Sequence, residues 1–216
     1  MPPDIPGYEN ARQIHGQESA RNISSARRVW TGVNDERAVR VLAISGSLRR
    51  ASSNTALIGA AVRLAPAMVG ITIYRDLEQI PPFNPDIDGD HTSEAVMALR
   101  AMLQACDAVL ISSPEYAHGV PGVLKNALDW VVGSGELVDK PIALINASAR
   151  AKYAWSSLAE TLTVMSAHVI RDASITIPLD GRGLDADGIV GDGDLSAALR
   201  SAVDALARAA RETHPV

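Results

Sequence analysis

The chain has 216 residues, of which 47% are hydrophobic and 21% charged, and its formal net charge is −5. This length suits one well-buried globular domain rather than two, and the mild acidity argues against a broad nucleic-acid-binding face. Because Cys106 is the only cysteine, the chain forms no internal disulfide and no zinc site built from thiolates.

The first part of the chain differs in character from the rest. Residues 1–37 mix Pro, Gly, Asn, Arg and Ser without a sustained period, which predicts a partly flexible N-terminal extension before a domain over 38–216. The first forty residues hold no apolar run of signal-peptide length, and no later run reaches transmembrane length. We therefore expect a cytoplasmic protein with no membrane attachment.

From residue 39 onward, short apolar runs alternate with segments of helical periodicity. Buried strands are predicted at 39–44, 71–74, 107–112, 141–145 and 174–177. Helices are predicted at 54–64, at 93–105, from Pro121, at 154–167, and over a last segment that carries Leu195, Leu199, Val203 and Leu206.

Five strands that alternate with five helices predict an α/β fold, a doubly wound parallel sheet covered on both faces. Right-handed crossovers leave few topologies, and we favour the strand order 2-1-3-4-5. In this order the switch point lies between the first and third strands. A ligand site is expected past the carboxyl ends of those two strands.

The loop after the first strand has the composition of a phosphate site. Hydroxyls, an amide and an arginine lie in a turn that enters a helix, whose N-terminus offers free N–H groups. The side chains that can add donors are Ser47, Arg49, Ser53, Asn54 and Thr55. Neither a Gly-x-Gly-x-x-Gly fingerprint nor a Walker loop follows the strand, which favours a mononucleotide. The alternative is that Ser53 and Asn54 simply cap the helix.

A second motif follows the third strand. It begins Ser113-Pro114-Glu115-Tyr116 and continues, from Pro121, as Pro-Gly-x-Leu-Lys-Asn-Ala-x-Asp-Trp. With the Gly-Ser-x-Arg-x-x-Ser-x-Asn sequence that begins at Gly46, it resembles the NAD(P)H-dependent FMN reductase family, which includes flavodoxin-like quinone, azo-dye and chromate reductases. The resemblance extends from about 39 to 177.

The resemblance implies roles for individual positions. Ser47, Arg49, Ser53, Asn54 and Thr55 would hold the FMN phosphate. Residues along the isoalloxazine ring would be Pro114, Glu115, Tyr116 and Ala117, with Ser148 from the loop after the fourth strand. The helix residues Lys125, Asn126 and Asp129 would anchor the loop or a subunit contact, because family members are usually dimers or tetramers.

The chain departs from the family pattern in two places. Many relatives carry an asparagine where this chain has Ala117-His118, and many carry a glycine-rich loop where this chain reads 146–153 with Arg150 and Lys152. Bulkier, cationic residues there would narrow the site or favour an anionic nicotinamide cofactor.

Four other features have simpler interpretations than catalysis. His118 is a loop histidine and is expected to be solvated rather than a proton donor, and His168, near a helix end, is expected to be structural. The acidic stretch 185–194 fails the EF-hand spacing, so we interpret it as a mobile, turn-rich linker. Hydride transfer needs no protein nucleophile, so Glu115 is expected to position the site.

The sequence thus predicts an enzyme that binds FMN and passes hydride from NAD(P)H, its co-substrate, through FMN to a quinone, a nitro or azo compound, or a flavin. One alternative is a flavodoxin-type carrier of single electrons, which usually presents a strongly acidic docking face. Another is a flavin-free binding module of the same fold. No metal is expected.

Overall fold

The computed structural model describes residues 38–213. The predicted N-terminal extension, 1–37, lies outside the described residues. The strands are β1 (Val39–Ser45), β2 (Val69–Tyr74), β3 (Ala108–Ser112), β4 (Pro141–Asn146), β5 (His168–Val169) and β6 (Ile175–Thr176). The helices are α2 (Ser53–Leu64), α3 (Glu94–Ala105), α4 (Gly122–Val132), α5 (Lys152–Val164), α6 (Ala186–Gly191) and α7 (Gly193–Thr213).

All strand pairs in this sheet are parallel, and the order is β2-β1-β3-β4-β5, which confirms the predicted topology. The predicted fifth strand is wrong in one respect. The last edge consists of two short strands, because β5 pairs with the start of β4 and β6 pairs with its end. The second of these, Ile175–Thr176, is the part that the sequence predicted.

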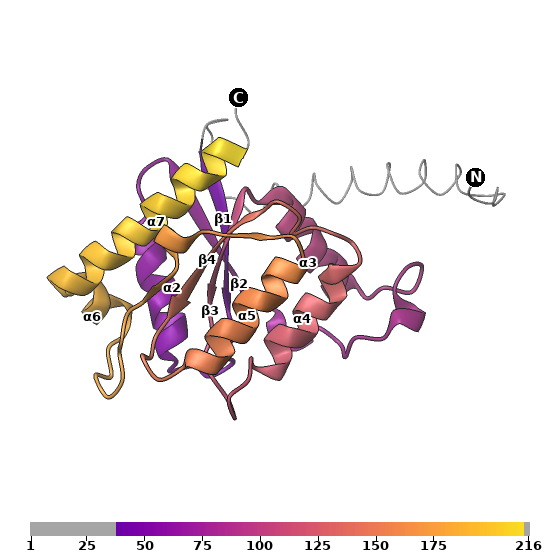
Figure 1. Ribbon diagram of the computed structural model, residues 1–216, viewed down its shortest axis with the longest axis horizontal. Helices are drawn as coiled ribbons and strands as arrows, with labels where there is room; N and C mark the ends of the chain where they lie inside the picture. The colour runs from indigo at the N-terminus through magenta and orange to yellow at the C-terminus, as the bar shows by residue number, and fades with distance from the viewer. Residues whose placement is uncertain (1–37, 214–216) are drawn as a thin grey trace.

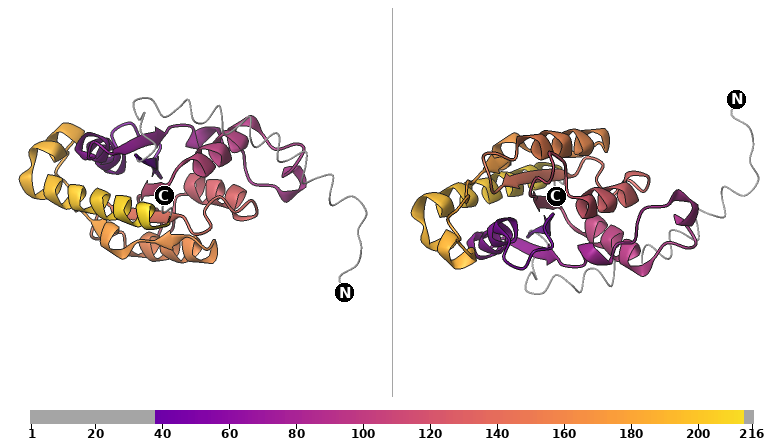
Figure 2. Two further views of the ribbon diagram at one scale, coloured as in Figure 1. Left: turned by 90° about the horizontal axis from the view of Figure 1, so that it is seen from above. Right: turned by 90° about the horizontal axis from the view of Figure 1, so that it is seen from below.

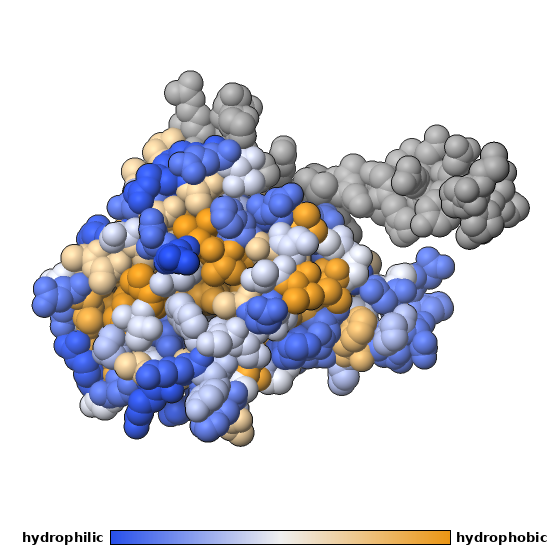
Figure 3. Space-filling view, viewed as in Figure 1, coloured by the Kyte–Doolittle hydropathy of each residue, from blue (hydrophilic) through white to orange (hydrophobic). Residues whose placement is uncertain are grey.

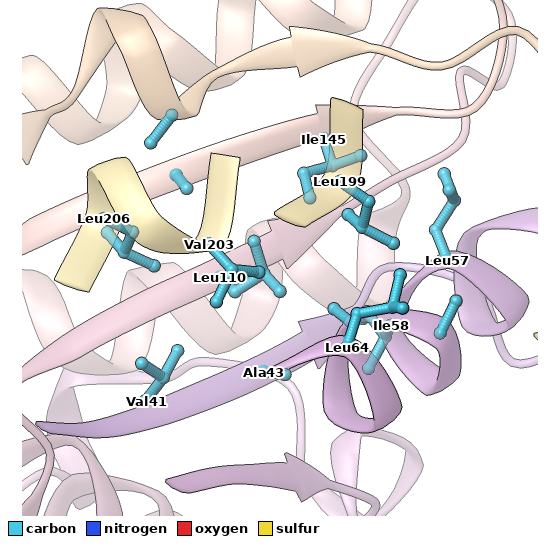
Figure 4. Close-up of a cluster of buried hydrophobic side chains, with 14 of the residues drawn as sticks. Val41, Ala43, Leu57, Ile58, Leu64, Leu110, Ile145, Leu199, Val203 and Leu206 are labelled. Atoms are coloured by element: carbon cyan, nitrogen blue, oxygen red, sulfur yellow. The ribbon is translucent and has the colours of Figure 1, made fainter. Parts of the chain in front are cut away.

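The helices cover both faces of the sheet. Helices α2, α6 and α7 lie on one face and α3, α4 and α5 on the other (Figures 1 and 2). Successive strand residues point to opposite faces, so Val41 and Ala43 join the first core cluster while Leu42 and Ile44 join the second. Figure 4 shows the first cluster, in which Leu199, Val203 and Leu206 of α7 pack over β1, β3 and β4.

The acidic stretch 185–194 is not a linker. Asp185 caps α6 by accepting the N–H of Gly188 at 2.9 Å, and Asp192 accepts the N–H of Leu195 at 3.1 Å near the start of α7. The aspartates that made the stretch resemble a loop therefore serve as helix caps. Within 38–213, no group of three or more acidic, histidine or cysteine side chains is arranged to hold a metal.

The Lys-Asn-Ala-Leu-Asp-Trp segment of α4 anchors the proline-rich connection between β2 and α3. Asn126 accepts the N–H of Phe83 at 2.7 Å and donates to the carbonyl of Pro81 at 2.8 Å. The fully buried Trp130 donates its indole N–H to the same carbonyl at 2.8 Å and packs edge-on against Phe83. Asn126 thus anchors the connection over 80–83 rather than the loop after β3 for which the sequence analysis considered it.

None of the helices within 38–213 combines the length and the apolar character that crossing a membrane requires.

Candidate functional site

The loops after β1 and β3 meet at the switch point of the sheet. The N–H of Gly46 donates to the carbonyl of Ser112 at 2.9 Å. A Cβ at position 46 would lie 2.4 Å from Ser113 Oγ and 3.2 Å from a methyl group of Leu124. Glycine is therefore required here by the close approach of two chain segments. The two predicted loops are neighbours, as the strand order demanded.

The start of α2 faces this junction. Ser52 is the N-cap, and its side chain accepts the N–H of Thr55 at 3.5 Å. The alternative that Ser53 and Asn54 merely cap the helix is therefore wrong. They are its first two residues, whose N–H groups have no carbonyl partner within the helix. These donors remain for a ligand at the N-terminus.

Three of the predicted side chains of the first loop have structural partners. Thr55 Oγ1 lies 2.9 Å from Ser45 Oγ, which ties the helix start to the end of β1. Asn54 is buried, and its Oδ1 accepts the hydroxyl of Ser112 at 3.0 Å. Ser47 is also buried and accepts the N–H of Arg49 at 3.3 Å, whereas the Arg49 side chain is exposed. The loop is thus shaped by its own hydroxyls.

The second loop forms a tight hairpin beyond Glu115. Tyr116 and Gly119 exchange backbone hydrogen bonds at 3.1 and 2.9 Å, and the two residues between them have positive φ, 49° for Ala117 and 62° for His118. Two central residues with positive φ are typical of a type I′ turn, for which Asn and Gly are preferred. The His118 ring stacks on that of Tyr153, with centroids 4.2 Å apart.

Glu115 connects this loop to α5. The N-cap of α5, Ala151, has no side chain that can cap, and Glu115 Oε2 accepts the N–H of Ala154 at 2.9 Å instead. The carboxylate lies at the positive end of the helix, where the helix dipole also favours it. The positioning role that the sequence analysis gave to Glu115 thus has a physical partner, the first turn of α5.

The loop after β4 is held from its other side by the segment after β6. The N–H groups of Ile177 and Leu179 donate to Asn146 O and Ala147 O, both at 2.8 Å. Asp180 then accepts the hydroxyl of Ser148 at 2.8 Å and the guanidinium of Arg150 at 2.9 Å. Hydrogen bonds from Arg150 and Ser148 lower the pKa of Asp180, and the same carboxylate raises the pKa of Arg150.

These segments enclose a cleft of about 400 Å³. Its volume lies in the range of small-molecule and cofactor sites. Of the predicted site residues, those that line it are Ser53, Asn54, Pro114, Glu115 and Ser148; those that do not are Ser47, Arg49, Thr55, Tyr116 and Ala117. The structure therefore brings residues of both predicted loops into one cleft. The predicted residues that do not line the cleft belong to the same two loop segments.

Several lining residues were not among the predicted cofactor-binding residues: Ser113, Asn146, Ala147, Arg150, Ala151, Leu179, Asp180 and Gly181. Those in 146–151 lie in the loop from which Ser148 alone was assigned to the flavin, whereas Arg150 was considered only for the shape of the site and the choice of nicotinamide. The segment 179–181 carried no motif, and its only signal was its place directly after a strand of the sheet.

The hydrogen-bond donors of the residues around the cleft suit a mononucleotide such as FMN. Its lining includes Ser53 and Asn54, the first two residues of α2, together with the loop segments 113–115 and 146–148. Converging N–H and hydroxyl donors suit a phosphate, and loop backbone suits the edge of a flat ring. The fold and cleft together define a doubly wound α/β protein with a nucleotide-type site at its switch point.

Comparison with known proteins identifies the family. The model of the NADPH-dependent FMN reductase family matches residues 39–181. An NAD(P)H-dependent FMN reductase from Pseudomonas aeruginosa is 35% identical over 158 residues, which are 69% of this chain and 83% of that protein. A 2-hydroxy-1,4-benzoquinone reductase from a Burkholderia species is 31% identical, over 81% of this chain and 98% of the relative.

A solved structure agrees with this assignment. FerB from Paracoccus denitrificans, described as a flavoenzyme NAD(P)H:(acceptor) oxidoreductase, superposes with a TM-score of 0.67 and 26% identity, over 81% of this chain and 98% of that one. The chain belongs to the NADPH-dependent FMN reductase family. It is a flavodoxin-like, FMN-dependent NAD(P)H oxidoreductase, as the motifs predicted.

Proposed function

We propose that this reductase uses FMN held in the cleft between α2 and the loops after β3, β4 and β6, and that quinones are among its acceptors. The observation that carries the proposal is the position of the cleft, past the ends of β1 and β3 and against the first turn of α2. Relatives named for quinone reduction support the acceptor class.

When bound, FMN accepts hydride from NAD(P)H and passes electrons to the acceptor. The protein's part is to bind, to orient and to exclude water. The N–H groups of Ser53 and Asn54 bind the phosphate, with Ser47, Arg49 and Thr55 shaping or charging the same loop. Pro114 and Glu115 position the ring, and Tyr116, Ala117 and Ser148 complete its surroundings. An open slot suits two substrates that stack on the ring in turn.

The test is the visible spectrum of the purified protein with added FMN, followed by anaerobic addition of NADPH and, separately, NADH. We expect bound flavin that either donor bleaches quickly and that a quinone reoxidises, with free FMN as the control for uncatalysed reduction. Bound flavin that neither donor reduces would instead support the single-electron carrier. If FMN is not retained, the flavin-free module is the better description.

We also propose that the chain assembles as a homodimer or homotetramer. Helices α4 and α5 flank a surface groove of about 340 Å³ that includes Leu128, Val132, Val164 and Met165. Val164 is 71% exposed and Val132 51% exposed. This face mixes apolar with polar side chains (Figure 3). Exposed apolar side chains around a groove are typical of an interaction surface.

Light scattering after size exclusion tests the assembly. We expect a dimer or tetramer for the unsubstituted protein and a smaller species for Val164→Asp, because a charge in an apolar interface is costly. Val62→Asp is the control, since Val62 is partly exposed on α2, across the sheet. Equal masses for the two variants would remove this face from the interface.

A cytoplasmic location is proposed as well, because the reaction consumes NAD(P)H, a cytoplasmic co-substrate. Cell fractionation with activity assays checks it.

A further inference from the structure

Arg150 has a distinctive position in the cleft. Among the described residues that line the cleft it is the only cation, alongside two acids, Glu115 and Asp180. The carboxylate of Glu115 is engaged by the N–H of Ala154. Arg150 is therefore the lining residue whose charge can attract an anion, in a chain whose net charge is −5.

The bond that holds Arg150 is easily exchanged. Its side chain is 84% exposed and that of Asp180 is 36% exposed, at a separation of 2.9 Å. Ion pairs this exposed contribute little net free energy. Asp180 would keep the hydroxyl of Ser148, 2.8 Å away, after Arg150 had left. A phosphate can accept two parallel hydrogen bonds from a guanidinium, whereas Asp180 accepts one from Arg150.

Two phosphate-bearing ligands would occupy this site, FMN and the nicotinamide co-substrate. The donors suited to the FMN phosphate lie at the start of α2, whereas Arg150 follows β4 and projects into solvent at the rim. A co-substrate that arrives from solvent passes this rim. NADPH differs from NADH by one phosphate, on the 2′ position of the adenosine ribose.

We propose that Arg150 leaves Asp180 to bind the 2′-phosphate of NADPH, and that this exchange makes the enzyme prefer NADPH over NADH. The proposal rests on the proposed function of the cleft and names the residue that selects its co-substrate. Asp180 then acts as a competitor for Arg150, which the phosphate must displace. Removal of Arg150 should therefore weaken the binding of the 2′-phosphate, and removal of Asp180 should strengthen it.

The test compares Arg150→Gln, Asp180→Asn and the control Arg208→Gln, an exposed arginine on α7. We measure kcat/KM for NADPH and for NADH, and the calorimetric Kd of the FMN-loaded protein for 2′,5′-ADP and for 5′-ADP. Arg150→Gln should lower the ratio of kcat/KM for NADPH to kcat/KM for NADH. It should also raise the Kd for 2′,5′-ADP by about tenfold or more, the value of one charge-assisted contact.

The other arms follow from the exchange. Asp180→Asn should lower the Kd for 2′,5′-ADP several-fold, because the amide competes less for the guanidinium of Arg150. Arg208→Gln should leave the Kd values and the kcat/KM ratio unchanged. Binding of 5′-ADP and of FMN should be the same in all variants. Weaker FMN binding in Arg150→Gln would assign Arg150 to the flavin phosphate and overturn the proposal.

An unchanged ratio with unchanged 2′,5′-ADP binding in Arg150→Gln would also overturn the proposal, as would an unsubstituted protein that does not bind 2′,5′-ADP. These failures differ from failure of the proposed function, in which neither nicotinamide reduces the flavin of the unsubstituted protein. The 2′,5′-ADP titration does not depend on turnover and tests Arg150 in that case too.

Discussion

One side of the cleft takes its lining residues, Ser53 and Asn54, from a single stretch of chain, residues 45–55, whereas the rest of the lining comes from 113–115, 146–151 and 179–181. We refer to these as the first wall and the second wall. In the first wall, Ser45 bonds to Thr55, ten positions away, and Ser47 to Arg49, two positions away. In the second, Glu115 bonds to Ala154 and Asp180 to Ser148, separations of 39 and 32 positions.

The difference shows how the two walls depend on the fold. The first wall takes its shape from neighbours in sequence and from one close approach, at Gly46. The second has its shape only when β3, β4 and β6 lie side by side, because the Glu115–Ala154 and Asp180–Ser148 bonds join segments that follow different strands. Changes in the first wall should therefore act on phosphate binding, and changes at the Glu115 bond of the second wall on stability and ring position.

The largest effect is expected from Arg49→Ala in the first wall. If Arg49 donates to the FMN phosphate, its loss weakens FMN binding by about 1.5–3 kcal/mol, the value of a charge-assisted hydrogen bond. The measurement is a fluorescence titration of FMN. Arg50→Ala is the matched control, an adjacent exposed arginine outside the predicted set. Equal losses in both variants would indicate general electrostatic attraction, and no loss would remove Arg49 from the site.

Gly46→Ala tests the contact between the walls. The added Cβ would lie 2.4 Å from Ser113 Oγ and 3.0 Å from Ser113 Cβ, so Ser113 or the loop that carries it must shift. We expect a loss of about 1–3 kcal/mol in the free energy of unfolding, as for overpacking of a close contact, together with weaker FMN binding. Urea denaturation and FMN titration measure the two effects.

Gly191→Ala is the control for Gly46→Ala, because a Cβ there meets nothing within 4 Å and the residue ends a helix, α6. Alanine has the higher helix propensity, so this variant should be as stable as the parent or slightly more so. Equal stability for Gly46→Ala would show that the two walls are not in tight contact.

Glu115→Ala tests the second wall. The substitution removes the acceptor of the Ala154 N–H and should cost about 0.5–2 kcal/mol of stability, as loss of a helix cap does. Urea denaturation measures it. Glu115→Gln keeps an acceptor oxygen and should recover most of the loss, while Glu160→Ala, on the exposed face of α5, should cost little. A Glu160 variant as destabilised as Glu115→Ala would contradict the capping role.

The same bond explains why the predicted start of α5 is wrong. Helix α5 begins at Lys152, before the predicted start at 154, because its cap comes from Glu115 rather than from a local Ser, Thr, Asp or Asn. It ends at Val164, before the predicted end at 167. Ser166 has a φ of 59°, and the residue that adopts this conformation just after a helix is usually glycine. Without that glycine the sequence contained no stop signal, and β5 was missed.

The strand order, by contrast, could be predicted because it follows from local runs and a general rule. The apolar runs of β1, β3 and β4 each appear in the sequence as continuous buried segments, and parallel crossovers constrain the rest. The first wall was found for a similar reason, since its polar residues are contiguous. Asp180 was not found, because only the pairing of β6 with β4 brings it to Ser148 and Arg150.

The smallest effect is expected outside both walls, in the hairpin of Ala117 and His118. Alanine at a φ of 49° is strained, whereas asparagine adopts this conformation readily. Ala117→Asn should therefore raise the free energy of unfolding by about 0.5–1 kcal/mol. Ala67→Asn is the control, since Ala67 is an exposed turn residue that lacks a positive φ.

Flavin affinity distinguishes two roles for this hairpin. If it only connects β3 to α4, Ala117→Asn should be more stable and bind FMN unchanged, because Ala117 does not line the cleft. A stabilised variant with altered FMN affinity would show that the turn conformation positions Glu115 and the ring. A variant that is no more stable than Ala67→Asn would show that the strain at Ala117 is relieved by other contacts, such as the stacking of His118 on Tyr153.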